Sequence, residues 1–140
     1  MKETNRIVIP VDKSEISRMA VEKGVDMAKL LGVDVTIISI DDSRQFIASA
    51  ALGNKLRKEH EAILEEHKKT AESKQVNAKT EIIVGDAPVD EIVKFINDDD
   101  LIVMASHQKK GLERFVLGSV SEEVLKRVNC NVMILKPKKP

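Results

Sequence analysis

The chain has 140 residues, which fits one domain of about 150 residues, so we expect a single domain over residues 1–140. Apolar residues make up 42% of the chain and charged residues 33%, which excludes intrinsic disorder and favours a packed globular protein. The 23 basic and 23 acidic residues cancel, so no net field attracts nucleic acid or an anionic membrane, and we expect neither as a partner.

The short apolar runs and the single cysteine indicate a cellular compartment. The longest uninterrupted apolar run has about five residues, whereas a membrane span needs about 18. The N-terminal segment lacks the cleavage site of a signal peptide. Cys130 alone cannot form an internal disulfide, as is usual in a reducing compartment. We therefore expect a cytoplasmic protein.

The first elements alternate between strand and helix. RIVIPV at Arg6–Val11 and DVTIISI at Asp34–Ile40 predict strands. Between them, apolar residues at helical spacing predict a helix over Ser14–Leu31, with Ser14 as its N-cap and Gly32 as its stop.

The longest segment between strands runs from Ser43 to Lys74. Its portion KLRKEHEAILEEHKKTAES predicts a helix, because opposite charges recur at three- and four-residue spacing. Its start, DSRQFIASAALGN, is compatible with a loop or with a separate helical turn. KTEIIV at Lys79–Val84 predicts the third strand.

The last elements continue the alternation. A third helix is predicted over Pro88–Asn97, with Asp86 as its cap, and LIVMA at Leu101–Ala105 predicts the fourth strand. A fourth helix begins at Gly118 or Ser119, and NVMILK at Asn131–Lys136 predicts the last strand. Because most strands are continuous apolar runs, we expect an open parallel α/β sheet with helices on both faces.

In such a sheet, ligands bind beyond the carboxyl ends of the strands, so the segments after the strands carry the candidate site. Asp12 follows the first strand, just ahead of a helix. After the fourth strand, Gly118-Ser119-Val120-Ser121 begins a helix, where free backbone N–H groups and two hydroxyls suit a phosphate. The alternative is that this Gly-Ser pair only caps the helix.

Three segments resemble the universal stress proteins of the UspA superfamily. They are IVIPVDKSEIS, VGDAPVDEIVKFINDDDLIVMASH and LGSVSEEVLKRVNCNVMILK, and the resemblance spans nearly the whole chain. It implies a Rossmann-like, adenine nucleotide alpha hydrolase-like sheet of five parallel strands in the order 3-2-1-4-5. It also implies a role in the stress response and a homodimer that pairs through the last strand, Asn131 to Lys136.

One branch of this family binds ATP through the pattern G-x-x-G, nine residues, then G-S/T. Here Gly118 and Ser119 match the final pair, with nine residues, Lys109 to Leu117, before them. Ala105 and Gln108 stand where the pattern has its first two glycines. A glutamine restricts the backbone and places a side chain where a phosphate would lie, although its amide can also donate a hydrogen bond.

The resemblance implies roles for further residues. It places Asp12 on the ribose or the base, the backbone at Ile40 beside the adenine, and Val84 and Gly85 where they close the pocket. Each has a structural alternative: Asp12 as a helix cap, Ile40 as core and Gly85 as a turn residue. The predicted nucleotide-binding residues are Pro10, Val11, Asp12, Ile40, Val84, Gly85, Ala105, Ser106, His107, Gln108, Gly118, Ser119, Val120 and Ser121.

The chain offers few candidates for catalysis or metal binding. His60 and His67 lie two helical turns apart, too far for one metal without further ligands, and we expect both on the surface. His107 lies in the candidate segment without a paired Ser or Cys nucleophile. The acidic run Asn97–Asp100 lacks calcium-loop spacing and is expected to be a solvated turn. We predict no catalytic or metal-ligating residue, and at most very slow ATP hydrolysis.

Two functional hypotheses follow. The first is a homodimeric regulator that binds ATP, AMP or another adenine nucleotide, with Mg²⁺ or Mn²⁺ as an open question. The alternative is a family member that binds no nucleotide and acts as a dimeric interaction module, which Ala105 and Gln108 favour.

Overall fold

Five parallel strands form one sheet in the part of the chain that the computed structural model describes, residues 3–45, 49–106 and 118–136. The strand order is β3-β2-β1-β4-β5, which confirms the predicted fold class and topology. The strands are β1 (Arg6–Val11), β2 (Asp34–Asp41), β3 (Ala78–Val84), β4 (Asp100–Ala105) and β5 (Asn131–Leu135).

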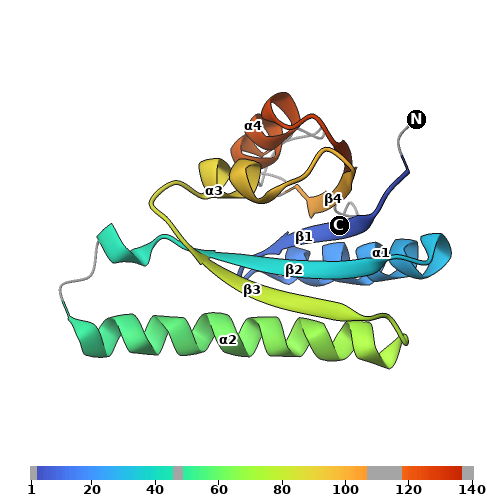
Figure 1. Ribbon diagram of the computed structural model, residues 1–140. Helices are drawn as coiled ribbons and strands as arrows, with labels where there is room; N and C mark the ends of the chain where they lie inside the picture. Colours follow the sequence, from blue (N-terminus) through green and yellow to red (C-terminus); the bar gives the residue numbers. More distant parts are fainter. Residues whose placement is uncertain (1–2, 46–48, 107–117, 137–140) are drawn as a thin grey trace.

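Helices cover both faces of the sheet (Figure 1). Helices α1 (Glu15–Leu31) and α2 (Ala50–Ser73) lie on one face, and α3 (Pro88–Phe95) and α4 (Ser119–Arg127) on the other; a short 3-10 turn, η1 (Ser43–Gln45), follows β2. Neighbouring strand residues alternate between two cores. Ile7 and Ile37 pack towards α1 and α2, whereas Val8 and Ile38 pack towards α3 and α4. This double burial explains why the strands are continuous apolar runs.

The helix ends agree with the sequence in part. Ser14 is the N-cap of α1, and the helix stops at Gly32, whose φ of 68° is in the left-handed region. Helix α2 begins at Ala50, capped by the Ser49 side chain, which accepts from the Leu52 N–H. The predicted Asp86 cap of α3 is wrong: the N-cap is Ala87. Pro88 is the first residue of the helix, where its fixed φ suits a helix start and its missing N–H leaves one fewer donor without an intrahelical partner.

The pairing of β1 differs on its two sides. Its ladder with β2 covers six residue pairs, from Arg6 with Asp34 to Val11 with Ser39. Its ladder with β4 covers only Arg6 with Asp100, Ile7 with Leu101 and Val8 with Ile102. Pro10 has no N–H with which to extend a ladder. The last residues of β1 and β4 are therefore not paired with each other, and this position is where the strand order reverses.

An ion pair joins β1 and β4 at their amino ends. Arg6 Nε and Nη2 each donate to one Asp100 carboxylate oxygen at 2.9 Å. Asp100 also accepts from the Asn97 N–H at 2.8 Å, and the guanidinium of Arg6 lies 4.7 Å from the centre of the Phe95 ring. Asp100 is 2% exposed, so the expectation of a wholly solvated Asn97–Asp100 turn is wrong at its last residue.

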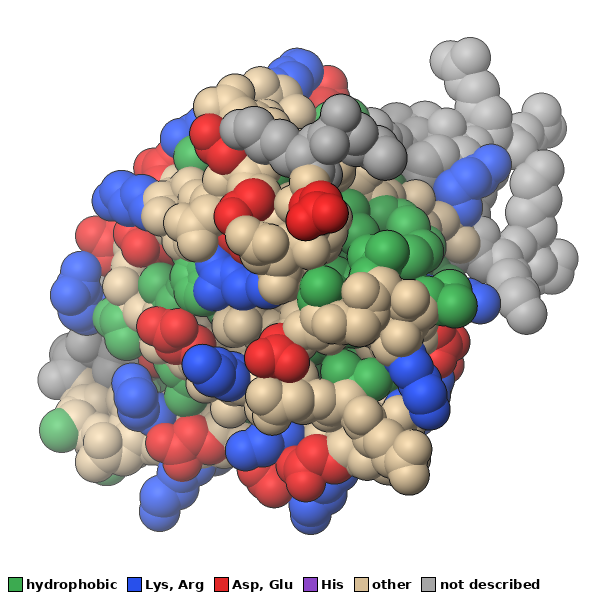
Figure 2. All heavy atoms as spheres, turned by 45° about the vertical axis from the view of Figure 1, so that its right-hand side comes forward, with side chains coloured by type: hydrophobic (Ala, Val, Ile, Leu, Met, Phe, Trp, Pro, Cys, Tyr) green, Lys and Arg blue, Asp and Glu red, His purple; other side chains and the backbone are tan. Residues whose placement is uncertain are grey.

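The surface mixes charges of both signs. Figure 2 shows Lys, Arg, Asp and Glu side chains interspersed over one face, in keeping with the zero net charge. Three ion pairs join α1 or the turn before it to α2 or its C-cap: Lys13 with Glu59, Arg18 with Glu66, and Asp26 with Lys74. In residues 3–45, 49–106 and 118–136, no helix is long and apolar enough to cross a bilayer.

Replacing Arg6 tests the ion pair at the base of β1 and β4. Arg6→Met leaves the Asp100 carboxylate buried without its partner, so we expect a loss of about 3 kcal/mol in the free energy of unfolding. The control is Arg18→Met, which removes an exposed arginine paired with Glu66 at 3.0 Å, and it should cost less than about 1 kcal/mol. Urea denaturation measures the free energy of unfolding of both variants. Equal losses would contradict a special stabilising role for the Arg6–Asp100 ion pair.

Candidate functional site

A cavity of about 540 Å³ lies at the carboxyl ends of the central strands. It occupies the position where β1 and β4 are no longer paired, and the first turns of α1 and α4 contribute to its wall. The residues that line it are Pro10, Val11, Asp12, Ile16, Ser17, Ala20, Ile40, Asp42, Pro88, Ile92, Met104, Ala105, Gly118, Ser119, Val120 and Ser121.

The structure brings most of the predicted site residues together in this wall. Segments about 100 residues apart in sequence meet there: Pro10–Asp12 at the end of β1 and Gly118–Ser121 at the start of α4, with Ile40 and Ala105 beside them. His107 and Gln108 lie outside the described residues. The residues that sequence reasoning missed are Ile16, Ser17, Ala20, Asp42, Pro88, Ile92 and Met104. Of these, only Asp42 carried a signal, because it is a carboxylate directly after a strand.

Asp12 forms the turn between β1 and α1. Its Oδ1 accepts from the N–H and the hydroxyl of Ser14 and from the hydroxyl of Ser17. The helix N-cap itself is Ser14, so Asp12 lies two residues before the cap. Asp12 is an exposed residue in the cavity wall, and a carboxylate there offers hydrogen-bond acceptors to a ligand.

The start of α4 forms the opposite part of the wall. Gly118 is the N-cap, and its N–H donates to the hydroxyl of Ser106 at 2.7 Å. Ser106 is fully buried and lies behind the wall, so its side chain fixes the helix start. The N–H groups of the first helical turn have no acceptor within a helix and carry the positive end of its dipole. This wall is suited to an anionic group at Ser119 and Ser121.

Val84 and Gly85 lie outside the cavity wall. Val84 is exposed at the end of β3, whereas Gly85 is buried and its N–H donates to the Asp41 carbonyl at 3.1 Å. A Cβ at Gly85 would overlap the side chain of Glu91 in the first turn of α3. A larger residue at this position would require the Glu91 side chain to move.

Neither histidine of α2 is a surface residue, which corrects the expectation. His67 is 6% exposed on the face of α2 that packs towards the sheet. His60 is partly buried: its Nδ1 lies 2.6 Å from the Ser39 hydroxyl, and its Nε2 lies 4.0 Å from Asp41 Oδ1. The charge pattern of α2 conceals both positions, because a short buried stripe interrupts an otherwise charged helix.

Ser39, His60 and Asp41 resemble a nucleophile, base and carboxylate only in composition. Ser39 is 1% exposed, so its hydroxyl has no access to a substrate. It lies on the face of β2 opposite to Ile40, which lines the cavity. A hydrogen bond from Ser43 lowers the pKa of the Asp41 carboxyl, and the charge of His60 contributes in the same direction. The cluster therefore joins α2 to β2 and is not part of the cavity.

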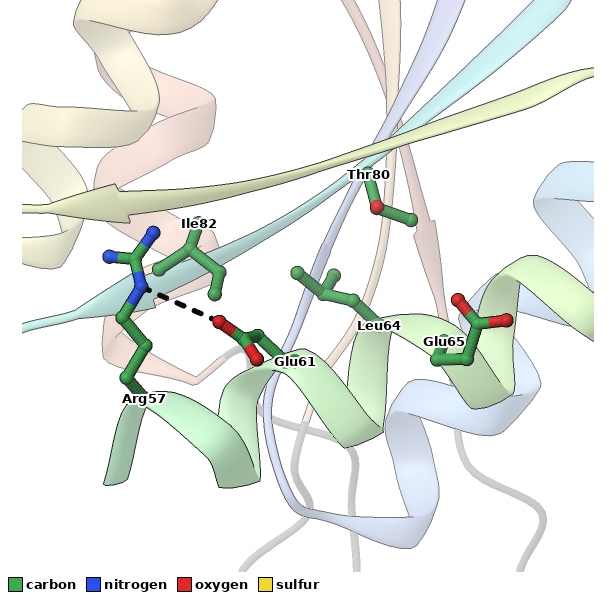
Figure 3. Close-up of a pocket in the computed structure, with 6 residues that line it drawn as sticks. All are labelled: Arg57, Glu61, Leu64, Glu65, Thr80 and Ile82. Carbon is green, nitrogen blue, oxygen red and sulfur yellow. Dashed lines mark ion pairs between the residues drawn. The ribbon is translucent and has the colours of Figure 1, made fainter. Parts of the chain in front are cut away.

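A second hollow lies between α2 and the edge strand β3. Its volume is about 320 Å³, and Figure 3 shows Leu64, Thr80 and Ile82 between the helix and the strand. An ion pair of 3.6 Å between Arg57 and Glu61 crosses its margin. It has no helix start and lies away from the strand ends, so it offers less for ligand binding than the larger cavity.

In residues 3–45, 49–106 and 118–136, no three His, Cys, Asp or Glu side chains come close enough together to hold a metal ion. The cavity wall itself provides two carboxylates, Asp12 and Asp42.

A parallel sheet covered by helices on both faces, with a cavity where its strand order reverses, defines a doubly wound α/β protein. The model of the universal stress protein family matches residues 3–136. Universal stress protein MJ0531 of Methanocaldococcus jannaschii is 38% identical over 143 residues, which cover 96% of this chain and 84% of that protein. The chain therefore belongs to the universal stress protein family.

Solved structures agree with this assignment. The structure of MJ0577, from Methanocaldococcus jannaschii, has a TM-score of 0.81 and 33% identity, covering 97% of this chain and 98% of its own. A universal stress protein solved in complex with cAMP has a TM-score of 0.71 and 25% identity, covering 96% of this chain and 98% of its own.

The buried histidine predicts a pH dependence of stability. Burial lowers the pKa of His67, so the unfolded chain takes up a proton there more readily than the folded protein. The free energy of unfolding should fall as the pH drops below about 6.5, by at most about 1.4 kcal/mol per pH unit from this group. Urea denaturation between pH 8 and pH 5 should show that the free energy of unfolding changes less with pH in His67→Leu than in the wild type. The same pH dependence in both proteins would exclude His67 as its source. Asp41, whose folded pKa is depressed, contributes stability that is lost only at more acidic pH.

Proposed function

We propose that this universal stress protein binds an adenine nucleotide such as ATP or AMP and acts as a cytoplasmic, homodimeric regulator of the stress response. The observation that carries the proposal is the cavity between the ends of β1 and β4, where Asp12 and the start of α4 face a common space. Occupancy of this space would change which surfaces the protein presents to partners.

The size and lining of the cavity support a nucleotide. Its volume of about 540 Å³ falls within the range of about 300–1,000 Å³ that is usual for small-molecule sites. Apolar side chains such as Ile40, Ile92 and Met104 suit a base, whereas the start of α4 suits a phosphate. The relative solved with cAMP binds an adenine nucleotide on the same fold.

Each polar group in the wall has a proposed role. Ser119 and Ser121 bind the phosphates through their hydroxyls and the N–H groups of the first turn of α4. Gly118 supports this turn, because its own N–H is already bonded to Ser106. Asp12 accepts hydrogen bonds from the sugar, and the backbone at Ile40 lies along the adenine.

A divalent cation would enter with the nucleotide. Asp12 and Asp42 are the only charged side chains among the described residues of the wall, and both are acidic. Mg²⁺ is commonly held by one or two carboxylates together with substrate phosphates. Mg²⁺ or Mn²⁺ bound to the phosphates would reduce the repulsion between them and this acidic wall.

The alternative, a dimeric interaction module without nucleotide, is favoured by Ala105. Its side chain belongs to the cavity wall at a position where the ATP-binding pattern of the family has glycine. The added methyl group reduces the space beside the backbone.

The two edges of the sheet support dimerisation through β5. Edge strand β3 carries exposed charges at Lys79 and Glu81, which disfavour pairing with another strand. By contrast, β5 has the sequence Asn-Val-Met-Ile-Leu, and its apolar residues are half-buried. Lys136 follows it directly. We infer that β5 and Lys136 pair with a second copy of this chain.

Calorimetric titration tests nucleotide binding. Nucleotide-free protein is titrated with AMP, ADP and ATP, with and without Mg²⁺. We expect dissociation constants in the micromolar range, which corresponds to about −8 kcal/mol. The double variant Asp12→Ala/Ser119→Ala should lose most of this affinity, because it removes groups from both ends of the site.

The outcomes separate the two functions. Binding that survives unchanged in the double variant would place the nucleotide elsewhere. No binding up to millimolar concentration would favour the interaction module, and Ala105→Gly/Gln108→Gly should then restore affinity if the two replaced glycines caused the loss.

A charge on the β5 edge tests the dimer. Ile134→Lys places a cation in the apolar strand, so we expect the sedimentation coefficient to fall from that of a dimer to that of a monomer. Thr80→Lys on the opposite edge strand is the matched control and should leave the dimer intact. A monomeric wild type, or equal dissociation by both variants, would contradict pairing through β5.

A further inference from the structure

The same turn occurs at the ends of β1 and β2. In each, a serine two residues after an aspartate donates both its N–H and its hydroxyl to the aspartate Oδ1. The N–H distances are 2.8 Å from Ser14 to Asp12 and 3.0 Å from Ser43 to Asp41. The two carboxylates differ in surroundings: Asp41 is buried on the α2 side near His60, whereas Asp12 lies in the cavity wall.

Only the turn after β1 includes a second serine, Ser17. Its hydroxyl donates to Asp12 Oδ1 at 3.0 Å and accepts from the Asp12 N–H at 2.9 Å. Ser17 lies three residues after the N-cap of α1, a position from which a side chain reaches back to the start of the helix. It is 6% exposed and is one of the residues that line the cavity.

These contacts fix the orientation of the Asp12 carboxylate. Oδ1 receives hydrogen bonds from two serines, and the backbone N–H of the same residue is held by Ser17. An ionised carboxylate is only an acceptor, so a carboxylate held in this way can recognise a ligand only through groups that donate. Because the side chain is ordered before a ligand arrives, binding does not have to order it.

We propose that Ser17 is a positioning residue that presents Asp12 to the hydroxyl groups of the ligand's ribose. This inference rests on the proposed nucleotide-binding function and adds the group that sets its sugar preference. A sugar without hydroxyls has no donor for Asp12. Ser17 therefore affects the affinity for ribonucleotides and leaves that for dideoxynucleotides unchanged.

Titration of Ser17→Ala with AMP and 2′,3′-dideoxy-AMP tests the inference. Wild-type protein should prefer AMP. Ser17→Ala should weaken AMP binding roughly 3- to 10-fold, the range expected for one hydrogen bond, and change dideoxy-AMP binding less than about twofold. In an Asp12→Asn background, Ser17→Ala should have no further effect, because the partner through which it acts has been altered.

Two further variants guard the interpretation. Ser73→Ala, which removes a hydroxyl bonded to the Thr70 carbonyl at the far end of α2, should bind both ligands as wild type does. If urea denaturation shows that Ser17→Ala is not folded, Ser17→Cys is used instead, because it retains the shape of the side chain with a weaker donor. Ser17→Cys should show a smaller loss of affinity, for AMP alone.

Each remaining outcome has one meaning. Equal weakening of both ligands, or no change for AMP, would overturn the positioning role and leave nucleotide binding in place. Equal affinity of the wild type for AMP and dideoxy-AMP would do the same, because Asp12 would then not recognise the sugar. Failure of the wild type to bind either ligand would instead overturn the proposed function itself.

Discussion

The short ladder between β1 and β4 is the constraint on which the candidate site depends. The two strands pair through three residues at their amino ends, where the Arg6–Asp100 ion pair joins the first of these pairs. Beyond Val8 they no longer pair, and the cavity lies between Pro10-Val11 and Met104-Ala105. If the ladder continued to the strand ends, backbone hydrogen bonds would close this space. One interaction thus holds the strands together at one end of the sheet while their separation forms a site at the other.

Buried serines fix the two walls of the cavity. Ser17 holds the Asp12 turn, and Ser106 holds the start of α4 by accepting from the Gly118 N–H. Each hydroxyl satisfies a backbone N–H that the end of a strand or the start of a helix would otherwise leave without a partner. The backbone N–H groups in the cavity wall need hydrogen-bond partners if the wall is to keep its shape without a ligand. Small hydroxyl side chains provide them without filling the space.

Much of the fold could be predicted because it depends on local patterns. The five apolar runs predicted every strand to within a residue at each end, and the family resemblance supplied their order. Asp100, His60 and His67 were misjudged, since their burial depends on residues distant in sequence: Arg6, for example, is 94 residues from Asp100. Helical periodicity could not show that one stripe of the charged helix α2 is buried. Ser17 was missed for a related reason, because only the folded turn brings its hydroxyl to Asp12.

Ser106 connects the cavity to the sheet edge that the proposed dimer uses. Its hydroxyl accepts from the Gly118 N–H at the start of α4, and its own N–H donates to the carbonyl of Leu135 at the end of β5. A ligand that draws the first turn of α4 towards its phosphates would act on one of these bonds, and pairing of β5 with a second copy would act near the other. Binding free energies are reciprocal, so any effect of nucleotide on dimerisation must equal the effect of dimerisation on nucleotide affinity. The proposed nucleotide site and the proposed dimer edge are therefore joined by a single buried residue, Ser106.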